Sequence, residues 1–217
     1  MRTCAVVPVK RFDDAKQRLD KALSAGSRRA LAEAMVTDVL TALRRAQLVE
    51  AVVVVTGEHS ATALARAHGA QAIGDDDRGH SHAARSGVDW ALEQGFERVL
   101  LVPGDCPTLD PGQLDELIGG GMEAPDVTVV PDRHGTGTNA LLLTPPDVIA
   151  PSFGPGSRER HEQAAAAAGA RARIAQPRSL VLDVDTADDL AVLHAAFAAS
   201  TGGAAHTRGL LARLARR

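Results

Sequence analysis

The chain has 217 residues, of which 45% are hydrophobic and only 2% aromatic, and its formal net charge is -3. This length and apolar content allow a buried core in one large domain or two small ones and exclude a disordered chain. The charge balance does not suggest a nucleic-acid or membrane surface, and so few aromatic side chains offer no platform for stacking bases.

The cysteines and the apolar runs indicate the compartment. Cys4 and Cys106 do not form a CxxC pair, so we expect two buried thiols in a reducing environment, and neither a zinc site nor a disulfide framework. The N-terminal apolar run is too short for a signal peptide, and no stretch approaches the length of a membrane span. We therefore expect a soluble cytoplasmic protein.

Short apolar runs and stretches with helical spacing alternate along the chain. Ser27 is the expected N-cap of the first helix, and Asp110 that of a later one. In chain order we expect a strand at 3–9, a helix at 27–46, a strand at 50–56, helices at 59–70 and 82–95, a strand at 97–105, a helix at 110–118, strands at 126–132 and 139–144, a helix at 157–170, and a strand, polar turn and helix within 179–200.

This alternation predicts an α/β three-layer domain, in which helices cover a mostly parallel sheet. The glycine-rich link at 132–139 indicates a local antiparallel excursion. The tail at 201–217 is first glycine-rich and then basic and amphipathic. We expect it to be a mobile extension, with a helix for an oligomer contact or a partner as the alternative.

Cations follow the first predicted strand, in the stretch "PVKRFDDAKQRL". In open parallel sheets, ligands bind beyond the carboxyl ends of the strands. Lys10, Lys16 and Arg18 at this place can hold a triphosphate. No Walker A glycine loop accompanies them, which excludes a P-loop enzyme. A solvated, charged helix face is the alternative interpretation.

Carboxylates follow two other predicted strands. Asp105 stands at the tip of the strand that begins at residue 97, where it can bind Mg²⁺ or cap a turn. Asp183 and Asp185 alternate on a segment expected to be extended, so they should point to opposite faces and only one should reach a given site. Asp188 and Asp189 fit the first turn of the last helix.

Two segments rich in glycine and hydroxyl groups could bind an anion. Residues 135–138 form two Gly-Thr pairs at the mouth of a strand, which favours either a hairpin turn or a backbone close to an anionic ligand. Gly154, Gly156 and Ser157 lead into a helix, where free amides and a hydroxyl make an anion site, or Ser157 is only a cap. Together with the cations and the two aspartates, these segments suit phosphates at both ends of a metal.

Five stretches together resemble one enzyme family, the 2-phospho-L-lactate guanylyltransferases and their relatives that act on phosphoenolpyruvate or 3-phosphoglycerate. The resemblance covers residues 5 to 197 and leaves the tail outside, so we assign residues 1–200 to one nucleotidyltransferase domain. The stretches occur in the order and spacing of the family and are "VPVKRFDDAKQRL" (7–19), "VPGDCPTL" (102–109), "PDRHGTGTNALLL" (131–143), "FGPGSRERH" (153–161) and "LDVDTADDL" (182–190).

The resemblance implies a fold and a role for individual residues. The fold is a Rossmann-like nucleotidyltransferase of the glycosyltransferase-A type. By match to the family's motifs, Asp105 and Asp183 bind Mg²⁺. In the same way, Thr138, Gly154 and Ser157 hold the phosphorylated three-carbon acid, and Lys10, Lys16 and Arg18 bind the triphosphate side of the nucleotide. Asp105, Asp183 and Lys10 are then the expected catalytic residues.

The implied reaction transfers GMP from GTP to the phosphate of the acid, releases pyrophosphate, and belongs to the biosynthesis of a deazaflavin coenzyme. We favour phosphoenolpyruvate over 2-phospholactate or 3-phosphoglycerate because the Ala/Arg-rich composition looks actinobacterial. The transferase that follows in the pathway is a candidate partner, since it would accept an unstable product. A second copy of this chain, in a homodimer, is another candidate partner.

One segment departs from the family pattern. Many relatives carry a Leu-Asn pair before the helix at 82–95, where this chain has Ser81 and His82, so base recognition is not carried over. His80 and His82 alone lack a third ligand for a metal. The rival functions are another nucleotidyltransferase, disfavoured because "PVKRFDDAK" contains no glycine, and a non-catalytic module that senses GTP or a metabolite.

Overall fold

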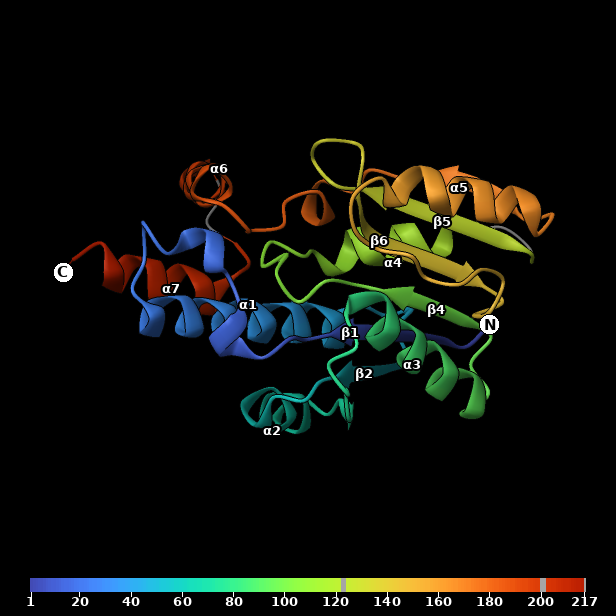
Figure 1. The fold of residues 1–217 in the computed structure, drawn as a ribbon, viewed down its shortest axis with the longest axis horizontal. Coiled ribbons are helices and arrows are strands. Elements are labelled where there is room, and N and C mark those ends of the chain that lie inside the picture. The colour runs from blue at the N-terminus through green and yellow to red at the C-terminus, as the bar shows by residue number, and fades with distance from the viewer. Residues whose placement is uncertain (122–123, 200–201, 217) are drawn as a thin grey trace.

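The computed structural model describes residues 1–121, 124–199 and 202–216. A seven-stranded sheet in the order β3-β2-β1-β4-β6-β5-β7 runs through these parts of the chain (Figure 1). The strands are β1 Thr3–Pro8, β2 Ala51–Val55, β3 Gln71–Ile73, β4 Arg98–Leu101, β5 Asp126–Pro131, β6 Thr138–Thr144 and β7 Arg171–Ile174.

One strand runs against its neighbours. β6 pairs antiparallel with both β4 and β5, whereas β1 with β2, β1 with β4, β2 with β3, and β5 with β7 are parallel pairs. The carboxyl ends of β1, β3 and β4 therefore lie at the same edge of the sheet as the amino end of β6. The predicted α/β fold with a mostly parallel sheet and a small antiparallel element is confirmed.

Helices cover both faces of the sheet, because each central strand is apolar on both sides. In β1, Val7 belongs to the buried cluster on the face of α1, α2 and α4, and Val6 belongs to the cluster on the face of α3 and α5. Gly87 lets α3 lie directly on β1, since a Cβ there would lie 2.2 Å from a methyl carbon of Val6. The helices are α1 Ala25–Arg45, α2 His59–Ala67, α3 His80–Glu93, α4 Pro111–Gly119, α5 Ser157–Ala167, α6 Ala187–Ala199 and α7 Ala205–Leu214, with three short 3-10 helices, η1 Phe12–Asp14, η2 Gln17–Leu19 and η3 Arg178–Leu180.

The tail does not match the expected mobile extension. Residues 205–214 form α7, which lies beside α1 (Figure 1) and buries Leu210 and Leu211 in a third apolar cluster. Asp38 of α1 accepts hydrogen bonds from the backbone N–H groups of His206 and Thr207 at 3.0 and 2.8 Å. It satisfies two of the orphan donors at the start of α7. The amphipathic pattern of the tail thus finds its partner inside the chain.

Two local predictions were wrong, and two short strands were missed. Ser24, not Ser27, caps α1, since its side chain accepts from the Ser27 N–H. The strand predicted after residue 179, at 180–182, is instead the end of η3 and the bend after it, and its apolar side chains pack against the core clusters without joining the sheet. The short strands β3 and β7 were not predicted. No helix in the described parts of the chain is long and apolar enough to cross a membrane.

Candidate active site

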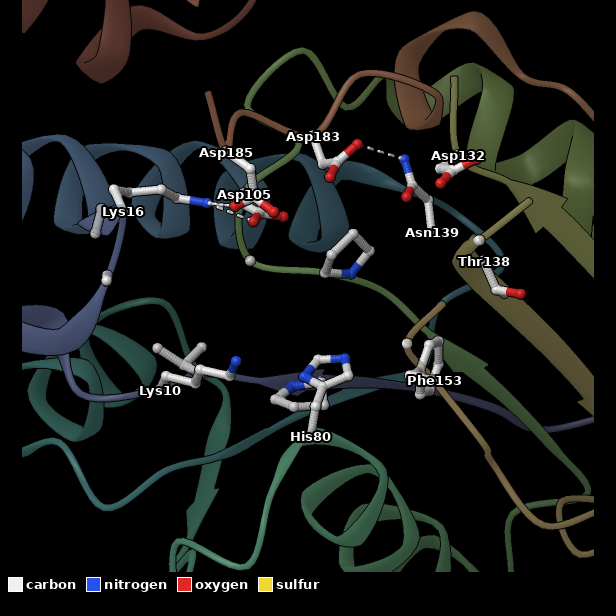
Figure 2. A pocket seen from close by; sticks show the side chains of 18 of the residues that line it. Lys10, Lys16, His80, Asp105, Asp132, Thr138, Asn139, Phe153, Asp183 and Asp185 are labelled. Carbon is white, nitrogen blue, oxygen red and sulfur yellow. Dashed lines mark hydrogen bonds and ion pairs between the residues drawn. The ribbon is translucent and has the colours of Figure 1, made fainter. Parts of the chain in front are cut away.

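A cleft of about 750 Å³ lies over the carboxyl edge of β1 and β4 and the amino end of β6 (Figure 2). Residues from seven separate segments line it: the loop after β1, one face of α1, the start of α3, the loop after β4, the 132–139 turn, the 153–157 loop and the 183–185 segment. The cleft brings together every predicted site residue, namely Lys10, Lys16, Arg18, Asp105, Thr138, Gly154, Ser157 and Asp183.

The three predicted cations differ in their surroundings. Lys10 and Arg18 are exposed and form no ion pair with any residue that the structure describes. The Lys16 side chain is only 7% exposed, and its Nζ lies 2.5 Å from Asp105 Oδ2 and 3.0 Å from Asp185 Oδ1. Burial alone would lower the pKa of Lys16, but the two carboxylates raise it above its ordinary value. Lys16 is therefore a fixed positive charge in the cleft.

The carboxylates of the cleft are electrostatically coupled. Burial would raise the pKa of Asp105, yet the charge and hydrogen bond of Lys16 hold it below its usual range. Burial and the neighbouring charge of Asp105 raise the pKa of Asp183. Asn139 Nδ2 donates to Asp183 Oδ1 at 3.2 Å and to the Leu180 carbonyl at 2.9 Å, which fixes this carboxylate in place.

The expectation that Asp183 and Asp185 point to opposite faces was wrong. Both line the cleft, because the segment bends after η3 and is not an extended strand. In Figure 2 Asp183 lies near Asn139, and Asp185 lies with Asp105 beside the Lys16 ammonium. Asp188 and Asp189 occupy the first turn of α6 as expected, and the hydroxyl of Thr186 accepts from the Asp189 N–H.

The pair Asp105 and Asp183 fits a hard divalent cation. The charge of Asp105 raises the pKa of Asp183, so a positive charge close to both carboxylates would stabilise the ionised form of Asp183. No group of three or more His, Cys, Asp or Glu side chains with metal-ligating geometry occurs in the described residues. A cation held by these two side chains would complete its coordination with oxygens of a bound ligand or water, as Mg²⁺ commonly does.

The Thr138 hydroxyl is oriented by a buried histidine that the sequence interpretation missed. His161 Nε2 accepts the Ser152 backbone N–H at 2.9 Å, so the proton of the neutral ring lies on Nδ1. Nδ1 lies 3.0 Å from Thr138 Oγ1 and donates to it. Burial is the main reason that the pKa of His161 falls to about 4, and Arg160 adds to it, so the ring is neutral at physiological pH. The Thr138 hydroxyl hydrogen is then left to donate into the cleft.

The glycine-rich turn at 132–139 has an internal structural reason. Gly135 has a φ of +75°, and a Cβ at Gly137 would lie 2.5 Å from Asp132 Oδ2. The Asp132 carboxylate accepts the Thr136 N–H at 3.1 Å, and the Thr136 carbonyl accepts the Arg158 N–H at 3.2 Å. A backbone hydrogen bond thus links this turn to the first residues of α5.

The backbone amides at the start of α5 are less free than expected. Ser157 N–H donates to the Gly154 carbonyl at 3.0 Å, and the next N–H donates to the turn described above. Gly154 has a φ of +107°, which favours glycine. By contrast, Ser157 Oγ is buried and has no hydrogen-bond partner within the described structure. Side-chain hydroxyls, rather than these amides, are therefore the available donors on this side of the cleft.

The segment that departs from the family pattern joins the two sides of the cleft. Ser81 Oγ accepts the Phe153 backbone N–H at 2.9 Å, which ties the start of α3 to the 153–157 loop. His80 packs edge-on against the Phe153 ring, with centroids 4.9 Å apart, and points into the cleft (Figure 2). His82 instead faces Asp76 at 3.1 Å. The two histidines therefore have different neighbours, which does not favour a metal pair.

The sequence contained a signal for one of the missed residues. Ser157 and His161 are four positions apart, so they share a face of α5; Ser157 lines the cleft, and His161 contacts Thr138, which also lines it. Asn139 was visible as a polar residue at the mouth of a strand, but its partner Asp183 is 44 positions away. Only the fold brings these two together.

Solved structures define the class of fold. A nucleotide-diphospho-sugar transferase from Desulfovibrio desulfuricans aligns with a TM-score of 0.71 at 18% identity, covering 89% of this chain and 87% of that one. A nucleotidyl transferase from Methanothermobacter aligns with a TM-score of 0.61 at 20% identity, covering 90% and 97%. The fold is that of the nucleotidyltransferases.

Sequence relatives narrow the class to a family. The family model described as "Guanylyl transferase CofC like" matches residues 3–208. A phosphoenolpyruvate guanylyltransferase of Conexibacter woesei is 50% identical, over 100% of this chain and 98% of that protein. A 2-phospho-L-lactate guanylyltransferase of Methanothermobacter thermautotrophicus is 32% identical (99% and 92% covered), and a 3-phospho-D-glycerate guanylyltransferase of Colwellia psychrerythraea 33% (89% and 91%). The chain belongs to the CofC-like guanylyl transferase family, as its sequence motifs indicated.

Proposed function

We propose that this nucleotidyltransferase transfers GMP from GTP to the phosphate of phosphoenolpyruvate and releases pyrophosphate, in the biosynthesis of a deazaflavin coenzyme. The relative named for phosphoenolpyruvate is 50% identical over the whole chain, whereas those named for 2-phospho-L-lactate and 3-phospho-D-glycerate are 32% and 33% identical. This difference favours phosphoenolpyruvate over the other two acids.

The observation that carries the proposal is the order of chemical groups in the cleft. Lys10 and Arg18, which pair with no acid in the described parts of the chain, lie on the side of β1. The carboxylates of Asp105 and Asp183 lie next, and the hydroxyls of Thr138 and Ser157 lie on the side of β6 and α5. A triphosphate suits the cations, and the phosphate and carboxylate of a small acid suit hydroxyl donors. The unpaired Ser157 Oγ supports a polar ligand at that end, because a buried hydroxyl without a partner is destabilising.

The reaction needs positioning and charge neutralisation more than proton transfer. An oxygen of the acceptor phosphate, already ionised at neutral pH, attacks the α-phosphorus of GTP, and the bond from that phosphorus to the bridging oxygen of pyrophosphate breaks. Lys10, Lys16 and Arg18 offset the charge on the leaving pyrophosphate. His161 is not a candidate base, since its Nε2 already accepts the Ser152 N–H.

Mg²⁺ is the proposed cofactor, held by Asp105 and Asp183, and when bound it supplies charge neutralisation for the phosphate oxygens. Two neighbouring side chains fix these carboxylates: Lys16 forms an ion pair with Asp105, and Asn139 donates a hydrogen bond to Asp183. Thr138, directed by His161, donates to the acceptor and holds it in line with the nucleotide.

The test is pyrophosphate release from GTP and Mg²⁺ with each of the three acids in turn, with mass spectrometry of the adduct. The transferase that follows in the pathway is added in a parallel series, to trap an unstable product. Release with phosphoenolpyruvate is the expected result. Release with only one of the other acids would correct the acceptor. No release with any acid, even with the trap, together with retained GTP binding, would favour the non-catalytic sensing module.

A further inference from the structure

A second cavity of about 330 Å³ adjoins the cleft, and none of the residues proposed to hold Mg²⁺ or the acceptor lines it. The two share Pro8, Val9, Lys10, Asp14 and His80 as walls. The second cavity extends from there to the residues that follow β3 and begin α3. It therefore lies on the nucleotide side of the cleft, away from Thr138 and Ser157.

Two carboxylates that line this cavity, Asp14 and Asp75, have no partner among the described residues, but Asp14 is exposed and only Asp75 has a buried oxygen. The residues after β3 include three consecutive aspartates, of which Asp77 pairs with Arg11 at 3.3 Å and Asp76 faces His82 at 3.1 Å. Asp75 lines the cavity and makes no hydrogen bond or ion pair with any residue that the structure describes. Its Oδ1 is buried, and an acceptor buried without a donor is destabilising.

We infer that Asp75 reads the base of the nucleotide and selects guanine; this rests on the proposed function. Guanine presents two neighbouring donors, N1–H and the 2-amino group, and an ionised carboxylate offers two acceptor oxygens and no donor. Adenine at N1 and cytosine at N3 present acceptors instead, so they would meet Asp75 with like polarity. Pro8, Val9 and Ala83 give the cavity apolar surface for the faces of a purine ring.

The position of the cavity agrees with the rest of the site. Lys10 borders both cavities, so a nucleotide with its base at Asp75 directs its phosphates past Lys10 towards Asp105. In Figure 2 Lys10 and His80 lie on the side of the cleft opposite Asp183 and Asn139. Along the sheet edge the order is then base beyond β3, phosphates beyond β1 and β4, and acceptor at β6.

The test compares GTP, inosine triphosphate and xanthosine triphosphate as donors to phosphoenolpyruvate, in the wild-type chain and in Asp75→Asn. Inosine lacks the 2-amino donor, and xanthine replaces it with a carbonyl that an asparagine amide can donate to. For the wild type we expect kcat/KM to fall at least about 10-fold from GTP to inosine triphosphate. For Asp75→Asn we expect a loss of about 100-fold with GTP, mainly in KM, and a preference for xanthosine triphosphate.

Asp76→Asn is the matched control, since this neighbouring acid is exposed and does not line the cavity; its GTP kinetics should equal the wild type. Equal use of GTP and inosine triphosphate by the wild type would overturn the inference, even if Asp75→Asn failed to fold. So would unchanged GTP kinetics in a folded Asp75→Asn. A wild type that is inactive with every nucleotide and every acid would instead contradict the proposed function.

Discussion

Lys16 is the residue on which the charge balance of the cleft depends. Its buried ammonium forms ion pairs with both Asp105 and Asp185. Asp183 has no such cation beside it, and burial and the charge of Asp105 raise its pKa. Removing one carboxylate therefore has different consequences at the two proposed metal ligands. Removing the Asp105 carboxylate leaves the buried Lys16 ammonium without one of its two partners, whereas removing the Asp183 carboxylate relieves its repulsion with Asp105.

We expect Asp183→Asn to lower turnover by at least about 10³-fold, since charge neutralisation is the main proposed source of catalysis. Its unfolding temperature should not fall, because burial and the charge of Asp105 already disfavour the ionised carboxylate in the wild type. Asp105→Asn should lose similar turnover but also stability. Pyrophosphate release and thermal unfolding measure both effects, and near-normal turnover in both variants would contradict the metal assignment.

Ser157→Ala separates the two ends of the cleft. The variant should raise the KM of the acceptor about 10-fold and leave the KM of GTP nearly unchanged, because it removes one hydroxyl donor from the acceptor side. Steady-state kinetics with each substrate varied in turn give the two constants. A larger effect on GTP would show that the nucleotide and acceptor regions are interchanged.

The lowered pKa of His161 should make the stability of the protein depend on pH. Its pKa is about 4 in the folded chain, against about 6.5 for an unperturbed histidine. As the pH falls, the histidine of the unfolded chain is protonated at a higher pH than that of the folded chain. The free energy of unfolding therefore decreases between about pH 6.5 and pH 4, by at most about 3 kcal/mol. In urea unfolding at pH 7 and pH 5, His161→Gln should lose less stability than the wild type over this interval. An equal loss would remove His161 as the cause.

At the scale of elements, apolar runs predicted those strands that lie inside the sheet, and motifs at their ends predicted the site. β3 and β7 were not predicted because they are edge strands of three and four residues without a fully buried side chain, so no run of buried residues marks them. The segment at 180–182 has the opposite property: Leu180 and Leu182 are buried by packing and make no strand. Burial can be predicted from such a pattern, but pairing depends on neighbours remote in sequence.

The C-terminal helix also depends on a remote neighbour. α7 joins an apolar cluster that contains Leu19, beside Lys16, and Leu182 and Val184, on either side of Asp183. The helix therefore supports two loops of the cleft from behind. Its amphipathic pattern was visible in the sequence, but the acceptor of its first amides, Asp38, is 168 positions away.

Asp38→Ala should loosen α7 and lower the free energy of unfolding by about 1–2 kcal/mol, as the loss of a helix cap does. Activity should fall at a lower temperature than in the wild type, because the loops at Lys16 and Asp183 lose support. Urea unfolding and the temperature dependence of turnover measure the two effects. Glu93→Ala, at an exposed end of α3, is the control and should change neither. Unchanged stability in Asp38→Ala would show that its two hydrogen bonds contribute little.

At the scale of the whole molecule, the cleft draws on segments from residue 8 to residue 185. Because its walls come from almost the entire chain, a ligand that spans them should stabilise the fold as a unit. GTP with Mg²⁺ at about 100 times its Kd should add about 2.7 kcal/mol to the free energy of unfolding. Thermal unfolding with and without Mg²⁺ measures this. In Asp183→Asn the increment due to Mg²⁺ should disappear, and an undiminished increment would place the metal elsewhere.

The two short edge strands have a consequence for the behaviour of the protein at high concentration. β3 has three residues, and β7 has four, of which Arg171 and Arg173 carry charge. A very short edge strand, such as β3, and a charged one, such as β7, are poor templates for the addition of another strand. Sheet-to-sheet aggregation of the folded chains should therefore be slow, and any assembly of two copies should use a helical surface rather than a continuous intermolecular sheet.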